Sequence, residues 1–261
     1  MIGFMSCDDL ELLHRLAHAA DAVSLRYFRR IVSTSVKDDG TIVSAADVAV
    51  EAALIKILRE QRPGDGVLSE EGGGSPGQRH RQWIIDPIDG TEPFLAGRRS
   101  WGTHVALTIG GELALGIITR PTEGIRWWAI RGEGAWRGHA EESPENAQRM
   151  QVSRTARLAH ARIGGFVASG SHLAKAIALH ARWSADSLGD IIALVGGRVD
   201  AVIAPAGGAW DHAPQVLLVT EAGGCYYDRF GGARFDAAGG VYTNGLLTDQ
   251  IRAIPAFNEL D

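Results

Sequence analysis

Apolar residues recur every three or four positions in two segments near the start of the chain. The first segment, residues 8–30, has one apolar face and predicts a long amphipathic helix. The apolar positions of that face are Leu10, Leu13, Leu16, Ala20, Val23 and Tyr27. A polar loop over residues 37–47 is expected to lead into a second helix that ends near Arg59. Ser44 and Asp47 approximate a capping box for that helix, and Pro63 stops it.

The middle of the chain changes to short apolar runs that predict strands. A run over residues 83–85 precedes two β-rich runs over residues 103–109 and 112–119. The Gly110-Gly111 pair between them is a strong hairpin signal. Two further strands are expected over residues 125–130 and 134–137.

The last third of the chain alternates predicted strands and helices, which is typical of layered α/β proteins. Strands are expected over residues 163–168, 200–204, 225–227 and 241–243, and helices over residues 171–183, 190–195 and 211–222 and after Gly245. The polar segment 141–148 contains Pro144 and is the predicted boundary between two lobes. We therefore expect an N-terminal α+β lobe over residues 1–140 and a C-terminal α/β lobe over residues 150–261.

Composition and charge exclude several classes of partner. The 261 residues carry a formal net charge of -5 without a basic cluster, so binding to a nucleic acid polymer is not expected. No apolar run approaches the length of a membrane span, and residues 1–6 lack the charged and apolar regions of a signal peptide. Cys7 and Cys225 lie far apart without metal-ligand spacing, and the predicted location is the reducing cytoplasm.

The candidate chemistry is concentrated between Trp83 and Gly97. Asp86 and Asp89 follow an apolar run three positions apart, and Gly90-Thr91 then forms a turn that can open a helix. Paired carboxylates offer hard oxygen ligands to a divalent cation, and a helix N-terminus points N–H groups at an anion. The combination indicates a phosphate ester, although Asp, Pro and Gly are also common in turns without any function.

Two further acidic sites strengthen the phosphate hypothesis. Upstream, Glu70-Glu71 follows a short apolar run, and downstream Trp210-Asp211 stands where a helix is expected to begin. The three sites in this order resemble the Glu-Glu, Asp-Pro-Ile-Asp-Gly-Thr and Trp-Asp signatures of the inositol monophosphatase superfamily of metal-dependent phosphatases. The resemblance runs from about residue 10 to residue 255 and implies the αβαβα sandwich of that family.

The resemblance also implies a ligand set for two or three Mg²⁺ ions. Glu70, Asp86 and the carbonyl of Ile88 would hold one ion. Asp86, Asp89 and Asp211 would hold a second, so that Asp86 bridges the two. The N-terminal lobe thus carries most of the ligands.

Catalysis in this scheme uses water rather than a covalent intermediate. Glu70, Thr91 and Asp47 are the predicted catalytic residues, with Thr91 positioning the attacking water and Asp47 orienting Thr91. The backbone N–H groups of Gly90 and Thr91 would bind the phosphate. Asp47 could cap its helix instead, and both roles can coexist because a carboxylate has two oxygens.

The substrate prediction depends on details outside the metal site. Residues 126–129, 131–135 and 243–247, together with Gly189-Asp190, are closer to the bacterial histidinol-phosphate phosphatase branch than to inositol monophosphatases proper. Gly189 and Asp190 are the predicted substrate-binding residues, because a partly buried carboxylate suits a cationic amine. Asp190 could also be only a helix N-cap. Ala204, where the family commonly has Glu, and Glu92-Pro93 depart from the family pattern and weaken this assignment.

The resulting prediction is a cytoplasmic, Mg²⁺-dependent phosphomonoesterase that forms a homodimer. Its predicted substrate is a small phosphorylated metabolite, and histidinol phosphate is the preferred candidate. Inositol phosphate or another sugar, amino-alcohol or nucleotide phosphate is the alternative substrate. A haloacid-dehalogenase-like mechanism is disfavoured because two residues, not one, separate Asp86 from Asp89. A non-catalytic, metal-binding regulatory protein is the second alternative.

Overall fold

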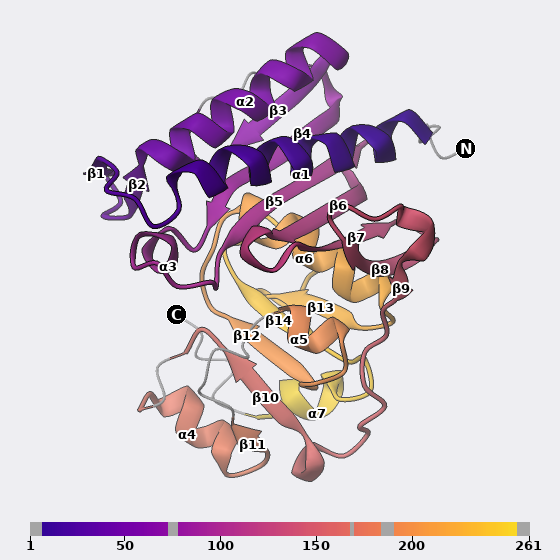
Figure 1. Cartoon of the computed structure of the whole chain (residues 1–261). Helices are drawn as coiled ribbons and strands as arrows, with labels where there is room; N and C mark the ends of the chain where they lie inside the picture. Colours follow the sequence, from indigo (N-terminus) through magenta and orange to yellow (C-terminus); the bar gives the residue numbers. More distant parts are fainter. Residues whose placement is uncertain (1–6, 73–77, 168–169, 184–190, 255–261) are drawn as a thin grey trace. The chain divides into compact units, whose positions relative to one another are not determined.

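The computed structural model describes residues 7–72, 78–167, 170–183 and 191–254 (Figure 1). The chain divides into two compact units, each described here by itself. Unit 1 comprises Met1–Arg131 and Trp136–Gln148, and unit 2 comprises Gly132–Ala135 and Arg149–Asp261. The division near residue 148 falls at the end of the polar segment 141–148, and residues 132–135 go with unit 2.

A seven-stranded sheet has the simple order β3-β4-β5-β6-β7-β8-β9. Its strands are β3 (Asp65–Ser69), β4 (Gln78–Asp89), β5 (Gly102–Ile109), β6 (Glu112–Arg120), β7 (Ile125–Ile130), β8 (Gly134–His139) and β9 (Gln148–Arg149). β3 pairs parallel to β4, whereas the pairs β4–β5, β5–β6 and β6–β7 are antiparallel. The predicted hairpin between β5 and β6 is confirmed, and Gly110 and Gly111 both have positive φ, at 64° and 83°.

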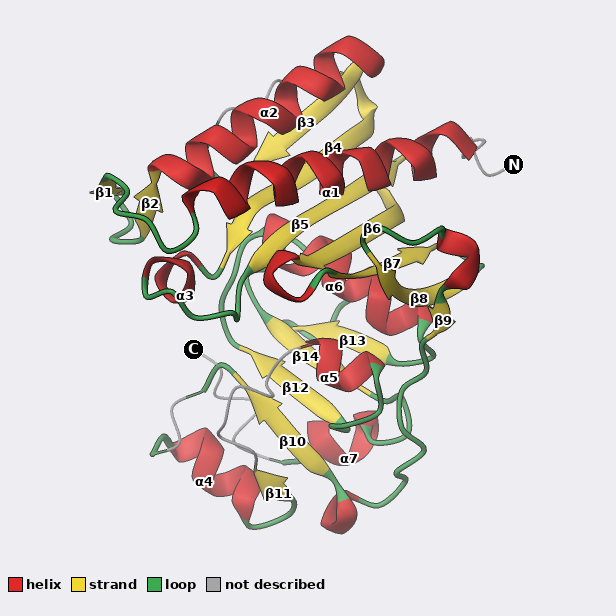
Figure 2. Cartoon of the chain, viewed as in Figure 1, coloured by secondary structure: helices red, strands yellow, loops and turns green. Residues whose placement is uncertain are grey.

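The two predicted long helices are confirmed and cover one face of this sheet. Helices α1 (Cys7–Tyr27) and α2 (Ala45–Gln61) lie side by side across the strands (Figure 2). Leu13 and Leu16 of α1 and Leu54 of α2 are fully buried in one core with Trp83 and Leu107 of the sheet. Each such leucine contributes about 1.5–3 kcal/mol through burial. Burial of this apolar stripe therefore holds the two helices on the sheet.

Two details of unit 1 differ from the sequence prediction. Residues 37–47 are not simply a polar loop, because β1 (Thr34–Val36) and β2 (Ile42–Ser44) pair as an antiparallel hairpin before α2. The strand predicted over residues 83–85 is also much longer, since β4 continues through Pro87 to Asp89 with an irregularity in its pairing. A bulge tolerates proline within a strand, which composition alone does not reveal.

Unit 2 is built on a five-stranded sheet of order β11-β10-β12-β14-β13. Its strands are β10 (Arg162–Gly165), β11 (Arg182–Trp183), β12 (Ala201–Ala204), β13 (Cys225–Asp228) and β14 (Gly240–Thr243), and its helices are α4 (His172–Ala178), α5 (Ile191–Val195), α6 (Ala209–Glu221) and α7 (Thr248–Arg252). Ile203 and Val241 pack with Ile177 of α4 and Ile251 of α7. The described elements thus form helix and sheet layers, and the predicted α/β fold class is confirmed.

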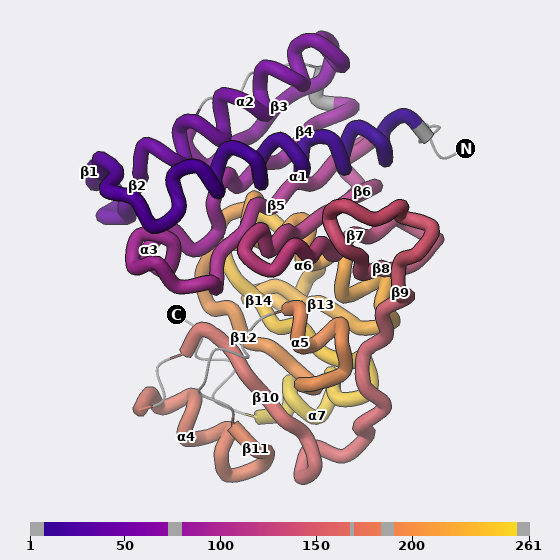
Figure 3. The backbone as a smooth tube through the Cα atoms, in the orientation of Figure 1, coloured from indigo at the N-terminus to yellow at the C-terminus, as the bar shows by residue number. Residues whose placement is uncertain are grey.

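The helix predicted over residues 171–183 was too long. It ends at Ala178, and Arg182–Trp183 pairs instead with β10 as a parallel strand. Residues 150–157 have no regular secondary structure, and Figure 3 shows them as extended backbone leading from β9 toward β10. Among the described helices, none has both the length and the apolar character needed to cross a lipid bilayer.

Candidate functional site

Strand pairing brings the acidic residues of unit 1 together. In the parallel pair, Ser69 of β3 lies opposite Ile85 of β4, and the N–H of Glu70 donates to the Ile85 carbonyl at 3.1 Å. Glu70 and Asp86 therefore both follow at the carboxyl end of this pair. On the other side of β4, Asp86 lies opposite His104 of β5.

The irregular end of β4 determines where Asp89 lies. Pairing with β5 skips from Asp86 to Asp89, and the hydroxyl of Thr103 donates to the Pro87 carbonyl at 2.8 Å inside this bulge. Gly90 then adopts φ 87°, and a Cβ there would lie 2.8 Å from the Ser100 carbonyl oxygen. The turn therefore requires glycine, for both its conformation and its space.

The helix that follows this turn is shorter than an anion-binding helix would usually be. Helix α3 (Thr91–Leu95) has five residues. Phe94 anchors it against Trp101, with ring centroids 4.8 Å apart in an edge-to-face contact. The N–H groups of Gly90 and Thr91, the predicted phosphate donors, thus lie at a turn that has little helix dipole behind it.

Asp86, Asp89 and His104 form a compact group. One ligand atom from each lies within 4.8 Å of the others. His104 Nε2 is 3.4 Å from Asp89 Oδ2, and the side chains of His104 and Asp89 are 1% and 31% exposed. The sequence analysis missed His104. The signal available was a histidine inside an otherwise apolar strand, but only the pairing with β4 places it beside Asp86.

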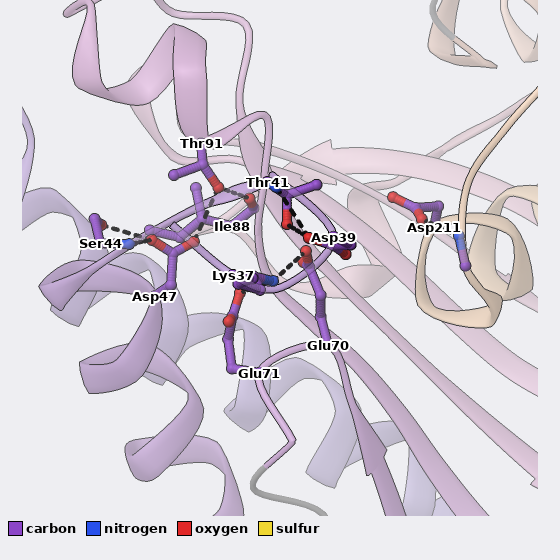
Figure 4. A network of polar contacts seen from close by, with 11 residues as sticks. Lys37, Asp39, Thr41, Ser44, Asp47, Glu70, Glu71, Ile88, Thr91 and Asp211 are labelled. Atoms are coloured by element: carbon purple, nitrogen blue, oxygen red, sulfur yellow. Dashed lines mark hydrogen bonds and ion pairs between the residues drawn. The ribbon is translucent and has the colours of Figure 1, made fainter. Parts of the chain in front are cut away.

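Lys37 lies against the two glutamates that follow β3. Its Nζ donates to Glu70 Oε1 and to Glu71 Oε1, both at 2.9 Å (Figure 4). Burial opposes the charge on the amine, but the hydrogen bonds to Glu71 and Glu70 outweigh it and raise the pKa of Lys37. The pair of acids is therefore held next to a fixed positive charge.

Asp47 connects helix α2 to the turn at Thr91. Its Oδ2 accepts from the N–H and the hydroxyl of Ser44 at 2.9 and 2.5 Å, so the predicted capping box is present. Its Oδ1 accepts from the Thr91 hydroxyl at 3.1 Å, and the Ile88 carbonyl lies 3.2 Å from the same hydroxyl (Figure 4). Asp47 is fully buried, so three donors hold this carboxylate in one place.

The remaining predicted residues belong to unit 2. Asp211 stands in the first turn of α6, where its Oδ2 accepts from the Gly208 N–H at 2.5 Å. The next residue, His212, is buried, and its Nδ1 lies 2.6 Å from the Tyr242 hydroxyl. Gly189 and Asp190, the predicted substrate-binding residues, lie outside the described residues.

The donors of unit 1 fit a divalent cation. The carboxylates of Glu70, Asp86 and Asp89 and the carbonyl of Ile88 are hard oxygen ligands on or beside β4, and a buried imidazole stands next to two of them. Carboxylates this close to one another repel, and a cation between them would remove that cost. A layered α/β chain with such a centre has the features of a metal-dependent phosphoric monoester hydrolase.

Comparison with known proteins identifies the family. The inositol monophosphatase family model matches residues 9–256. The chain therefore belongs to the inositol monophosphatase family, and it is a phosphoric monoester hydrolase. The family resemblance predicted from the sequence motifs is confirmed.

Individual relatives cover almost the whole chain. A Streptomyces griseus protein named glucose-1-phosphate thymidylyltransferase is 45% identical over 249 residues, which are 94% of this chain and 95% of that protein. The histidinol-phosphatase of Mycobacterium tuberculosis is 35% identical over 253 residues, covering 95% and 97%. Among solved structures, the IMPase of Thermotoga maritima has a TM-score of 0.82 at 25% identity and covers 97% of this chain and 98% of that one.

Proposed function

We propose that the chain is a Mg²⁺-dependent phosphomonoesterase whose substrate is histidinol phosphate or a similar small amino-alcohol phosphate. The observation that carries the proposal is the convergence of Asp86 and Asp89 next to a Thr91 hydroxyl hydrogen-bonded to buried Asp47. The histidinol-phosphatase of M. tuberculosis, 35% identical along the chain, supports the choice of substrate.

The proposed ligand set follows the family resemblance. Glu70, Asp86 and the Ile88 carbonyl would hold one Mg²⁺, and Asp86, Asp89 and Asp211 a second divalent cation. Bound divalent cations would supply Lewis-acid activation of a water and neutralise charge on the phosphoryl oxygens. Asp211 remains a prediction from its Trp-Asp motif, and its test is whether Asp211→Asn weakens Mg²⁺ binding measured by titration calorimetry.

The chain's own groups would orient the reactants. Because the Thr91 hydroxyl hydrogen points to Asp47, the oxygen of Thr91 keeps a lone pair that can accept a hydrogen bond from the attacking water. That bond would direct the water oxygen toward phosphorus. The N–H groups of Gly90 and Thr91 would hold the phosphate oxygens. The Lys37 amine, 2.9 Å from Glu70 Oε1, would hold the Glu70 side chain in place at the end of β3.

The amine of histidinol phosphate is the feature that would distinguish it from a polyol phosphate. Asp190 and Gly189 are proposed to contact this end of the substrate, because a carboxylate gains most from an opposite charge. Inositol phosphate and other sugar or nucleotide phosphates are the competing substrates. The name of the S. griseus relative adds nucleotidyl transfer to glucose 1-phosphate as an outcome to be tested.

The experiment is a phosphate-release assay with Mg²⁺ and with EDTA. The panel contains L-histidinol phosphate, inositol 1-phosphate, a 3′-phosphoadenosine nucleotide, fructose 1,6-bisphosphate and glucose 1-phosphate, the last also with dTTP. We expect Mg²⁺-dependent release that is fastest from histidinol phosphate. Formation of dTDP-glucose without phosphate release would replace the hydrolase with a transferase, and binding of Mg²⁺ without turnover on any ester would favour the regulatory alternative.

One variant of a predicted ligand and one control variant make the assay specific. Asp89→Asn should abolish release, because it removes a cation ligand in a solvent-accessible position without removing a packing residue. Glu92→Gln removes an exposed acid three residues further on and should leave release unchanged. Equal activity of the Asp89 variant and the wild type would exclude the two-cation assignment.

Assembly and location are proposed on the resemblance alone. We propose a homodimer in the cytoplasm. Light scattering at micromolar concentration should give twice the 27.9 kDa mass of the chain, and a monomer across that range would refute the dimer.

A further inference from the structure

His104 is a buried imidazole directly beside the proposed cation position, and no step of the proposed function uses it. It lies on β5 opposite Asp86 of β4, and its side chain is 1% exposed. The inference drawn from it rests on the proposed function, because it concerns the ligands of the same cations.

The spacing of the three side chains matches a coordination shell. Metal–nitrogen and metal–oxygen bonds of about 2.0–2.2 Å at tetrahedral angles separate neighbouring ligand atoms by about 3.4 Å. His104 Nε2 and Asp89 Oδ2 are 3.4 Å apart, and one ligand atom from each of His104, Asp89 and Asp86 lies within 4.8 Å of the others.

The strand that carries His104 is paired with a neighbouring strand on each side. β5 is paired on both sides, with His104 opposite Asp86 of β4 and opposite Ile118 of β6. The neighbours of His104 along the strand, Thr103 and Val105, are both fully buried. A histidine on a central strand loses little conformational freedom when a cation binds, so its nitrogen is a preorganised donor.

We propose that His104 is a nitrogen ligand at the Asp86–Asp89 cation position and makes that position selective for Mn²⁺ or Zn²⁺ over Mg²⁺. Imidazole suits borderline transition-metal dications, whereas Mg²⁺ prefers oxygen donors and retains water. The other position, with Glu70, Asp86 and the Ile88 carbonyl, has only oxygen donors and keeps its preference for Mg²⁺. The two cations in this enzyme would therefore differ in kind.

The test compares cation binding in the wild type with two variants. His104→Asn and His104→Gln remove the imidazole and keep a polar group of similar size. His80→Asn is the matched control, because His80 is an exposed histidine on the same strand as Asp86 and about 20 Å away along it. Circular dichroism verifies that each variant is folded, and the two replacements at position 104 guard against the failure of one.

Two readouts without substrate decide the outcome. Mn²⁺ and Zn²⁺ affinities should fall by about 100-fold in the His104 variants, as expected for loss of a ligand or its close support, while Mg²⁺ affinity changes by less than about threefold. X-ray absorption of protein loaded with one equivalent of Zn²⁺ should show imidazole scattering in the wild type and in His80→Asn, and none in His104→Asn.

Each contrary result has a distinct meaning. Unchanged imidazole scattering in His104→Asn, or none in the wild type, overturns the proposal. An equal loss of Mg²⁺ and Mn²⁺ affinity also overturns it, because His104 would then only position Asp89. Phosphate release is measured separately, so the imidazole signal in a protein that hydrolyses no ester would reject the proposed function and leave the ligand assignment standing.

Discussion

Asp47 combines a structural role with a predicted catalytic role on two different oxygens. Oδ2 caps α2 through Ser44, and Oδ1 accepts from Thr91. Because the oxygens are separate, substitutions at the two partners can separate the two roles. This makes the Thr91–Asp47 contact testable without removing the buried carboxylate itself.

We predict that Ser44→Ala changes mainly the stability and Thr91→Val mainly the turnover. Ser44→Ala should lower the free energy of unfolding by about 1 kcal/mol through loss of the cap and leave kcat nearly unchanged. Thr91→Val should lower kcat by about 10²–10⁴-fold, the range typical of general acid–base groups, with a smaller effect on stability. Urea unfolding and steady-state kinetics with Mg²⁺ measure both. A Thr91→Val enzyme with wild-type kcat would remove Thr91 from the mechanism.

His14 gives a prediction that depends on pH. It packs edge-on against Trp128 with ring centroids 4.8 Å apart, and burial together with the charge of Arg126 lowers the pKa of His14 to about 4. The unfolded chain binds a proton near pH 6.5 and the folded chain does not, so stability falls as the pH drops from about 6.5 toward 4. The contribution lost is at most about 3 kcal/mol.

The comparison with His14→Gln isolates this contribution from those of other groups. Unfolding free energies of both proteins at several pH values between 4 and 7 give two curves, and the variant should have the shallower slope. Parallel curves would mean that His14 takes up its proton equally in the folded and unfolded chains.

At the residue scale, the sequence identified the acids but not their neighbours. Asp86, Asp89 and Asp47 could be singled out because short motifs and a capping pattern contain them. His104 could not, since it joins the site through pairing of β4 with β5, and pairing register is a long-range property. The contact of Lys37 with Glu70 and Glu71 was missed because it is also long-range, formed between residues more than 30 positions apart.

At the scale of elements, β5 and β6 approach each other closely at Gly102, beside the end of β4 that carries Asp89. A Cβ on Gly102 would lie 1.8 Å from the Thr119 carbonyl oxygen, and Gly102 is also the partner of Asp89 in the β4–β5 pair. We predict that Gly102→Ala pushes these strands apart and lowers the free energy of unfolding by about 3 kcal/mol or more, the upper range for overpacking.

Gly64→Ala is the matched control, because a Cβ there meets nothing within 4 Å. It should change stability by less than about 0.5 kcal/mol. Thermal unfolding of the three proteins measures the effect, and phosphate release from folded Gly102→Ala should be reduced as well. Equal stability of both variants would mean that the sheet yields at Gly102 without cost.

The elements that could be predicted are those with a strong local pattern. α1, α2 and the β5–β6 hairpin follow from periodicity and from a glycine pair, and these signals require no knowledge of the rest of the fold. β11 and the β1–β2 hairpin were not predicted, because strands of two or three residues have no period of their own and exist only through their partners. The bulge at Pro87 is likewise visible only once β5 is in place.

At the scale of the whole molecule, the crowded carboxylates should make stability depend on the cation. Without a cation, Asp86 and Asp89 repel each other within a site less than 5 Å across, and water screens this repulsion only in part because Asp86 is buried. With Mg²⁺ at 100 times its Kd, binding stabilises the folded chain by about 2.7 kcal/mol. We predict a rise of roughly 5–10 °C in Tm between EDTA and saturating Mg²⁺, as expected for a chain of this size.

Whether Asp89→Asn is more or less stable than the wild type should depend on the presence of the cation. In EDTA the variant should be at least as stable as the wild type, because one of two repelling charges is gone. In Mg²⁺ it should be less stable, because a ligand is gone, whereas Glu92→Gln should behave like the wild type in both conditions. Scanning calorimetry of the three proteins measures these differences. If Asp89→Asn gained as much from Mg²⁺ as the wild type, the cation would bind elsewhere, and the carboxylates at the end of β4 would have to be explained without a metal.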